Sequence, residues 1–221
     1  MTNFYKQNQR ISPIKQTSSL NKRGKLNSAN TLNKRRKSNN PNDINNTSEI
    51  KDTTEPNIKA IVGNWIVAVG TLLSAIGNTP STIFTQQTLN DFNVIGHILE
   101  AGGIAIVSET EDTLLYTVGD QLQAIGNLTV VVGLLSENEQ TTQLLERQGN
   151  LIQVVGLGLV INTEGKLTLL QTLYNTGIII QLIGTTILAV ANVETKEGQV
   201  TKAVGAWIKS IGAFITALAT E

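Results

Sequence analysis

The chain has 221 residues, of which 40% are hydrophobic and 15% charged, and its formal net charge is zero. It contains no cysteine, which excludes disulfides, thiol catalysis and thiolate metal sites. Residues 1–57 hold 11 Lys and Arg against 4 Asp and Glu, whereas residues 58–221 hold 6 against 13, so a basic arm of net charge +7 precedes an acidic body of net charge −7.

The basic arm, residues 1–57, is rich in Asn, Ser, Lys and Arg and poor in large apolar side chains. Such a segment buries too little apolar surface to offset its ordering entropy, so we predict that it is disordered. Our favoured interpretation is a solubilising tail. The alternative is contact with a polyanion or an anionic membrane surface, for which the candidate residues are Lys22, Arg23, Lys25, Lys34, Arg35, Arg36 and Lys37.

Glycines spaced by seven are the main pattern of residues 58–221. A helix turns about 100° per residue, so glycines seven apart stay on one stripe of its surface. Each such glycine costs roughly 1 kcal/mol relative to Ala, and close approach of a neighbouring helix would offset that cost. We therefore predict a helix-packing role for fifteen of the nineteen glycines: Gly63, Gly70, Gly77, Gly96, Gly103, Gly119, Gly126, Gly133, Gly149, Gly156, Gly177, Gly184, Gly198, Gly205 and Gly212.

Apolar residues in the same region recur at i, i+3, i+4 and i+7, which is typical of amphipathic helices. Pro80 and the turn sequences at 163–165 and 195–198 mark breaks between them. The sequence predicts six helices at about 58–77, 81–107, 109–135, 137–162, 166–192 and 196–220. Two capping boxes, Ser108 with Glu111 and Ser136 with Glu139, are predicted to begin the third and fourth helices.

These elements predict an all-α fold: six antiparallel amphipathic helices in a repeat or bundle with close glycine-mediated packing, preceded by the disordered arm. The predicted domains are 1–57 and 58–221. Each unit carries a Leu or Ile three residues after a glycine, so we expect a neighbouring helix to seat a Leu or Ile in the notch above each glycine.

The units share the form G-x-x-[IL]-x-x-[IV]-G, as in GNWIVAVG at 63–70, GDQLQAIGN at 119–127, GNLIQVVG at 149–156 and GAWIKSIG at 205–212. In these motifs residues 58–221 resemble an uncharacterised repetitive family with glycine heptads from endospore-forming bacteria, a domain of unknown function. The resemblance implies no activity, cofactor or catalytic residue.

Polar and aromatic residues recur at fixed places in the units. Trp65 and Trp207 occupy matching positions in the first and last units, where they either pack in the core or anchor at an interface. The recurring amides either make buried hydrogen bonds that set the register or form the wet edge of each stripe, and we favour the wet edge. They are Asn64, Gln123, Asn127, Asn150, Gln153 and Gln181.

No residue set predicts catalysis. His97 is the single histidine, and Glu100, one turn away, either orients it or is simply solvated; a Glu–His pair alone is weak evidence for acid–base catalysis. No second His and no Cys exist to complete a metal site, and most other acids stand at predicted helix starts, where they complement the helix dipole. We expect no catalytic, cofactor-binding or metal site, no cofactor, no small-molecule substrate and no enzymatic activity.

Residues 60–77 and 176–193 carry no charge and approach the length of a membrane span, whereas polar residues such as Asp120, Gln153 and Lys209 break the apolar runs of other units. We predict a non-enzymatic structural protein that associates with itself and is water-soluble or bound at a surface. An integral membrane bundle with a cytoplasmic basic arm, and a β-rich or amyloid-like assembly, remain alternatives. The N-terminus shows no apolar core of a Sec signal peptide, so we expect an intracellular bacterial protein, cytoplasmic or membrane-associated.

Overall fold

A computed structural model describes residues 57–163, 165–192 and 194–220 of the chain. Within these ranges the chain forms helices of 20 to 23 residues and no strand, which confirms the predicted all-α class. The predicted disorder of the arm, and its basic residues, lie outside the described residues. The helices are α2 (Ile58–Gly77), α3 (Gln86–Ser108), α4 (Leu114–Leu134), α5 (Glu139–Leu159), α6 (Leu169–Val190) and α7 (Lys196–Leu218).

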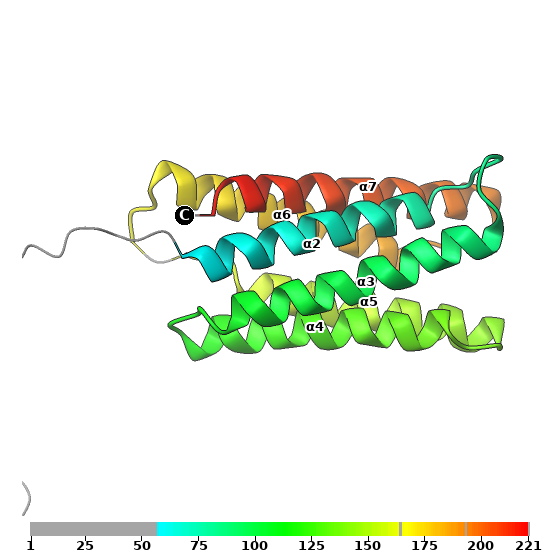
Figure 1. Ribbon diagram of the computed structural model, residues 1–221, viewed down its shortest axis with the longest axis horizontal. Coiled ribbons are helices and arrows are strands. Elements are labelled where there is room, and N and C mark those ends of the chain that lie inside the picture. Colours follow the sequence, from blue (N-terminus) through cyan, green and yellow to red (C-terminus); the bar gives the residue numbers. More distant parts are fainter. Residues whose placement is uncertain (1–56, 164, 193, 221) are drawn as a thin grey trace, which may run out of the picture. The chain divides into compact units, whose positions relative to one another are not determined.

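Successive helices run antiparallel and form three hairpins, α2–α3, α4–α5 and α6–α7 (Figure 1). Contacts between α3 and α4, between α5 and α6, and between α7 and α2 join the hairpins into a closed ring. We call the end of the ring where α2 begins the arm end; it also carries residues 109–113, 160–163 and 165–168. The distal end carries residues 78–85, 135–138, 191–192 and 194–195.

Within each hairpin, glycines of the two helices face one another. A Cβ placed on Gly126 would lie 2.6 Å from the carbonyl oxygen of Gly149, and a Cβ on Gly149 would lie 2.5 Å from that of Gly126. Both separations are well below van der Waals contact, so only residues without a side chain permit this backbone spacing. The other facing pairs are Gly119 with Gly156, Gly63 with Gly103, Gly70 with Gly96, Gly177 with Gly212, and Gly184 with Gly205.

The remaining ladder glycines meet other neighbours. Gly77 faces the backbone of α3 at Leu89, Gly133 faces the first turns of α5 at Leu145, and Gly198 faces Asn192 in the preceding connection. Contrary to our expectation, Leu and Ile side chains do not generally fill the notches above the glycines; most of the glycines meet the backbone of the partner helix instead. Within each hairpin the two helix backbones therefore contact one another directly at the glycines.

Helix starts differ from two of the predictions. Ser108 does not begin α4. It is the last residue of α3, which extends this far because Val107 is buried against Gly63 of α2. The N-cap of α4 is Thr113. Ser136 does not begin α5 either; the N-cap there is Asn138, whose Oδ1 accepts from the Thr141 amide.

Other boundaries follow local hydrogen bonds. Helix α3 begins at Gln86 rather than 81, because Ser81 Oγ accepts from the backbone amides that follow it and Thr85 caps the helix. A capping box that we did not predict begins α6, where Thr168 and Gln171 bond reciprocally. The predicted turn between α5 and α6 contains Gly165, whose φ of 66° lies in the left-handed region that favours glycine.

Replacing Gly126 with Ala tests the backbone contact. The added Cβ would press on the Gly149 carbonyl and force α4 and α5 apart, so we expect the free energy of unfolding to fall by about 1–3 kcal/mol. The matched control is Gly102→Ala in α3, where the added Cβ would meet no atom within 4 Å apart from the adjoining residues and backbone of its own helix. Helix propensity should then raise stability by up to about 1 kcal/mol. Denaturant unfolding of both variants measures the difference, and a stabilised Gly126→Ala variant would contradict the account.

Candidate functional site

The ring is polar inside and apolar outside. Among the described residues, eighteen polar or charged residues are buried beside nineteen hydrophobic ones, whereas twenty-eight large hydrophobic side chains are exposed. In a water-soluble protein the interior is mainly apolar and buried charges are rare. The polar interior is therefore the feature of this molecule most in need of a functional explanation.

The prediction of a wet edge for the recurring amides was wrong. Asn64, Gln123, Asn127, Asn150, Gln153 and Gln181 are all buried, with at most 7% of any of them exposed. The reason is helical geometry: the glycines face the partner helix, and residues one and four positions after a leading glycine share that inward side. Residues two and six positions after it, such as Trp65 and Val69, are exposed.

All three hairpins meet in a central cluster, which we define as Ser74 and Glu100 of α2–α3, Gln153 of α4–α5 and Lys209 of α6–α7. Lys209 Nζ donates to Glu100 Oε2 at 2.5 Å and to Gln153 Oε1 at 2.7 Å. Ser74 Oγ donates to Glu100 Oε1 at 2.9 Å. Glu100, Gln153 and Lys209 each stand four residues after a ladder glycine, in α3, α5 and α7, so equivalent positions of the three hairpins converge here.

His97 lies beside the central cluster and is 3% exposed. Its Nδ1 is 2.8 Å from Asn127 Oδ1 and 3.8 Å from Glu100 Oε1. Asn127 Nδ2 donates to the backbone oxygen of Gln123, so Asn127 Oδ1 is the acceptor for a proton on His97 Nδ1. This bond gives His97 a structural partner. Within the described ranges, no group of three or more His, Cys, Asp and Glu residues is placed to hold a metal ion.

A second ion pair, which is partly buried, lies toward the distal end, where Lys202 Nζ is 2.7 Å from Glu146 Oε2. Asn78 Nδ2 donates to Asn93 Oδ1 at 3.0 Å between α2 and α3. Two open pockets of about 480 and 400 Å³ are lined in part by Glu146 and Lys202, so water reaches this end of the interior.

Toward the arm end, Asp120 of α4 is 6% exposed. Its Oδ1 accepts from Gln123 Nε2 at 3.1 Å, and its Oδ2 has no hydrogen-bond partner. A pocket of about 270 Å³ opens at this end beside Glu111 and Tyr174. Partial burial, and then the adjacent negative charge of Asp112, raise the pKa of the Glu111 carboxyl above its usual value.

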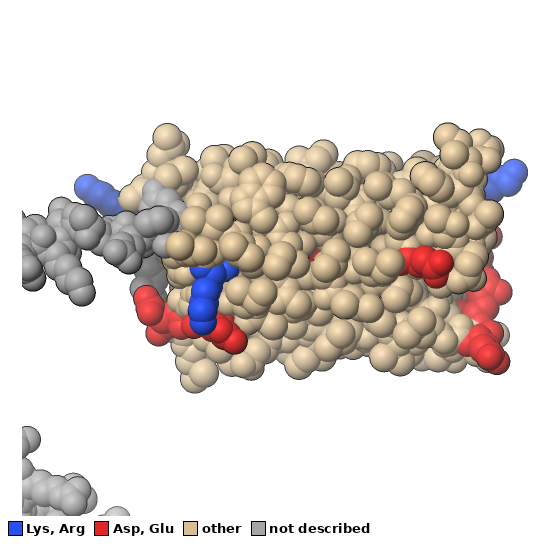
Figure 2. Space-filling view, viewed as in Figure 1, with Lys and Arg blue, Asp and Glu red and all other residues tan. Residues whose placement is uncertain are grey.

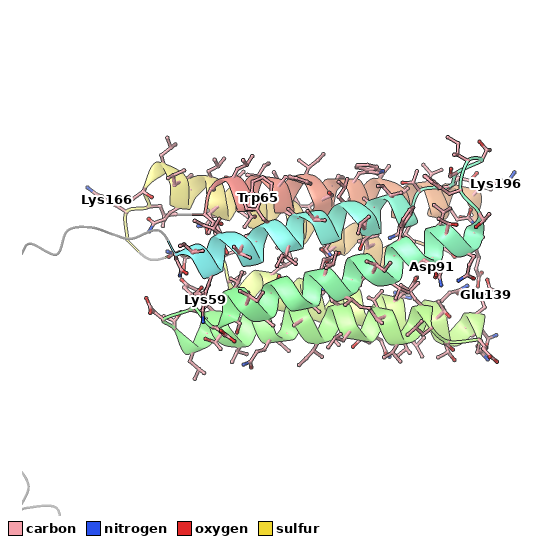
Figure 3. The ribbon with its side chains drawn as sticks, viewed as in Figure 1. Lys59, Trp65, Asp91, Glu139, Lys166 and Lys196 are labelled. Carbon is pink, nitrogen blue, oxygen red and sulfur yellow. The ribbon has the colours of Figure 1, made fainter. Side chains whose placement is uncertain are left out.

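The two tryptophans lie on the outside of the ring, each 40% exposed. Trp65 makes an edge-on contact with Phe214, with ring centroids 6.1 Å apart, and Trp207 Nε1 donates to Thr79 Oγ1 at 3.0 Å. Figure 3 shows Trp65 on the lateral face of α2. Neither side chain is fully buried, which leaves their outer faces available to solvent or to lipid.

These observations define a class of protein, an all-α ring of six described helices with a charged, hydrogen-bonded interior. The chain belongs to a family of unknown function (DUF6944), whose profile matches residues 58–217. This agrees with the resemblance to a domain of unknown function, and it covers the helical body rather than the arm. No curated protein and no solved structure matches the chain.

Sequence reasoning missed the ionisable part of the interior. Glu100 was considered only as a partner of His97, and Asp120 and Lys209 only as breaks in apolar runs. The signal was present, because Glu100, Gln153 and Lys209 hold the same offset from a ladder glycine. A residue four positions from a glycine that faces a partner helix must share its face.

Lys209→Met tests the central cluster. The substitution keeps an unbranched side chain but leaves Glu100 buried without its basic partner, so we expect a loss of about 3–5 kcal/mol in the free energy of unfolding. Adding Glu100→Gln should restore most of it, because no charge then remains unpaired. Lys59→Met is the control. Lys59 and Glu109 pair at 3.1 Å but are about two-thirds exposed, so we expect the free energy of unfolding to fall by less than about 1 kcal/mol. Equal losses in both single variants would contradict the buried ion pair.

Proposed function

We propose that the helical domain is an integral membrane bundle, a non-enzymatic structural protein whose six helices cross a bilayer. The supporting observation is that polar side chains are buried and large hydrophobic side chains exposed, the reverse of the usual arrangement in a water-soluble protein. Figure 2 displays one face of the bundle, on which charged atoms gather toward the two ends and uncharged atoms cover the length between them. A bilayer accepts apolar side chains over that length and requires polar groups to be satisfied inside the protein.

Helix length supports this proposal. At 1.5 Å per residue, helices of 20 to 23 residues span about 30–35 Å, which matches a hydrocarbon core of roughly 30 Å. Two described helices, α2 and α6, are long and apolar enough to cross a membrane by length and composition alone. In the other four, polar residues that lower the mean hydropathy include Glu100, Asp120, Gln153 and Lys209, which are buried in the ring.

The polar groups on the lateral surface are compatible with lipid. Thr129 and Thr186 donate their hydroxyl protons to backbone oxygens one turn earlier, at 2.8 and 2.7 Å, so these hydroxyls need no water. Gln121 and Arg147 lie about two turns from the first residues of α4 and α5, so their long side chains can extend toward the headgroups. An apolar groove of about 330 Å³ beside Trp65 and Leu99 has the character of an acyl-chain site.

The charge distribution suggests an orientation. The arm carries 11 Lys and Arg and joins the bundle at Ile58, so the positive-inside tendency places the arm end in the cytoplasm. There the basic residues of the arm would contact anionic lipid headgroups. The bacterial source implied by the resemblance remains a prediction.

A second candidate is the self-associating assembly in water that the sequence favoured. Soluble monomers rarely expose an apolar patch larger than roughly 300–600 Å². The twenty-eight exposed hydrophobic side chains would then have to be covered by further copies of the chain. This candidate predicts a large homo-oligomer that needs no lipid.

Alkaline carbonate extraction of cell membranes separates the two candidates. Carbonate removes proteins held at a surface by charge but not helices that cross the bilayer, so we expect the full-length chain to remain in the membrane pellet. A chain without residues 1–57 should remain there too, because the helices and not the arm hold it. Release of both forms into the supernatant as a large oligomer would support the soluble assembly and contradict the membrane proposal.

The absence of cysteine makes the orientation directly testable. Glu137→Cys places a thiol at the distal end, and Thr163→Cys places one at the arm end; both native side chains are exposed. In spheroplasts, a membrane-impermeant maleimide should label Glu137→Cys, and should label Thr163→Cys only after permeabilisation. The reverse pattern would contradict the orientation, and equal labelling of both before permeabilisation would contradict a span.

A further inference from the structure

We propose that Asp120 binds one monovalent cation, of the size of sodium, inside the arm end of the ring. Three carboxylates are buried in the described part of the chain: Glu100, Asp120 and Glu146. Lys209 is paired with Glu100 and Lys202 with Glu146. Asp120 has no basic partner among the described ion pairs, and a bare carboxylate in a dry interior costs several kcal/mol or more.

The surroundings of Asp120 supply the space and the ligands. Asp120, whose Oδ2 has no hydrogen-bond partner, lines a cavity of about 20 Å³. A cavity of roughly 10–15 Å³ already holds a particle of the size of water, and a sodium ion is no larger. Asn64, Gln123, Gln181 and Thr216 line the same cavity from α2, α4, α6 and α7. Carboxylate, amide and hydroxyl oxygens are the ligands that hard cations prefer.

Charge balance selects a monovalent ion. One carboxylate neutralises one positive charge, whereas a divalent ion at the same place would leave a net charge of +1 away from water. Among the described residues, Asp120 is the one acidic residue that lines this cavity, so no second carboxylate is present there to balance a divalent ion. This proposal departs from the expectation of no metal site, because most of its ligands are amides and a hydroxyl rather than His, Cys, Asp or Glu.

The cavity has an approach from the arm end. The pocket of about 270 Å³ there shares Asn64, Val107 and Tyr174 with the lining of the cavity. Glu111 lines that pocket, and its carboxylate would attract a cation toward the approach when ionised. The site depends on residues within one ring and does not depend on whether the ring lies in a bilayer or in water.

Thermal unfolding of the purified full-length chain, followed by tryptophan fluorescence, tests the site. At pH 8 and constant ionic strength, replacing choline chloride with NaCl should raise Tm by a few degrees in a saturable manner. Asp120→Asn, which keeps the size of the side chain and removes its charge, should abolish the sodium response. The matched control is Asp91→Asn, an exposed acid of α3, which should keep it.

Calorimetric titration of the wild-type protein with NaCl gives a second reading that needs no variant; one site per chain is expected. A Tm that is the same in sodium and choline, together with no heat of binding, would overturn the proposal and assign neutralisation of Asp120 to a proton. A full sodium response in Asp120→Asn, or an equal response to MgCl₂ at matched concentration, would also overturn it. Carbonate extraction is a separate readout, so failure of the membrane proposal would leave this one standing.

Discussion

Reciprocal glycine contacts fix the distance between the two helices of each hairpin, and the rest of the structure depends on that distance. Gly126 and Gly149 illustrate it, since each lies against the carbonyl oxygen of the other. At such a spacing little room remains for large apolar side chains between helices, and nine of the nineteen buried hydrophobic residues are alanines. Stability must then come largely from backbone packing and from hydrogen bonds in the interior.

The polar interior follows from the same geometry. With the glycine stripe turned to the partner helix, positions one and four residues later also face inward, and equivalent positions of three hairpins meet around one axis. Two of the three acids buried in the described helices obtain a lysine from another helix, in each case from α7. Asp120 lacks such a lysine, and a cavity of about 20 Å³ lies beside it. The large apolar side chains occupy the outer surface, where lipid is the proposed neighbour.

Much of the fold could be predicted from periodicity. The first helix was placed at 58–77, as found, and the six described helices, their antiparallel order and the glycine stripes follow local patterns. What periodicity cannot provide is the direction in which an apolar stripe faces, because the same pattern suits a core in water and a surface in lipid. For this reason Asn127 and Gln153 were expected at a wet edge although they are buried. The bond between Lys209 and Glu100 joins residues 109 apart, a distance over which no local pattern carries information.

The central claim is that the apolar outer surface of the ring faces lipid, and Trp207 tests it most directly. This residue is the twelfth of the 23 in α7, and its indole lies on the outer surface toward the distal end, where it bonds to Thr79; it is one of only two tryptophans. In Trp65→Phe protein reconstituted into vesicles, lipids brominated along their acyl chains should strongly quench the remaining Trp207 fluorescence, and aqueous iodide should not. Unchanged fluorescence in brominated lipid together with quenching by iodide would contradict the account.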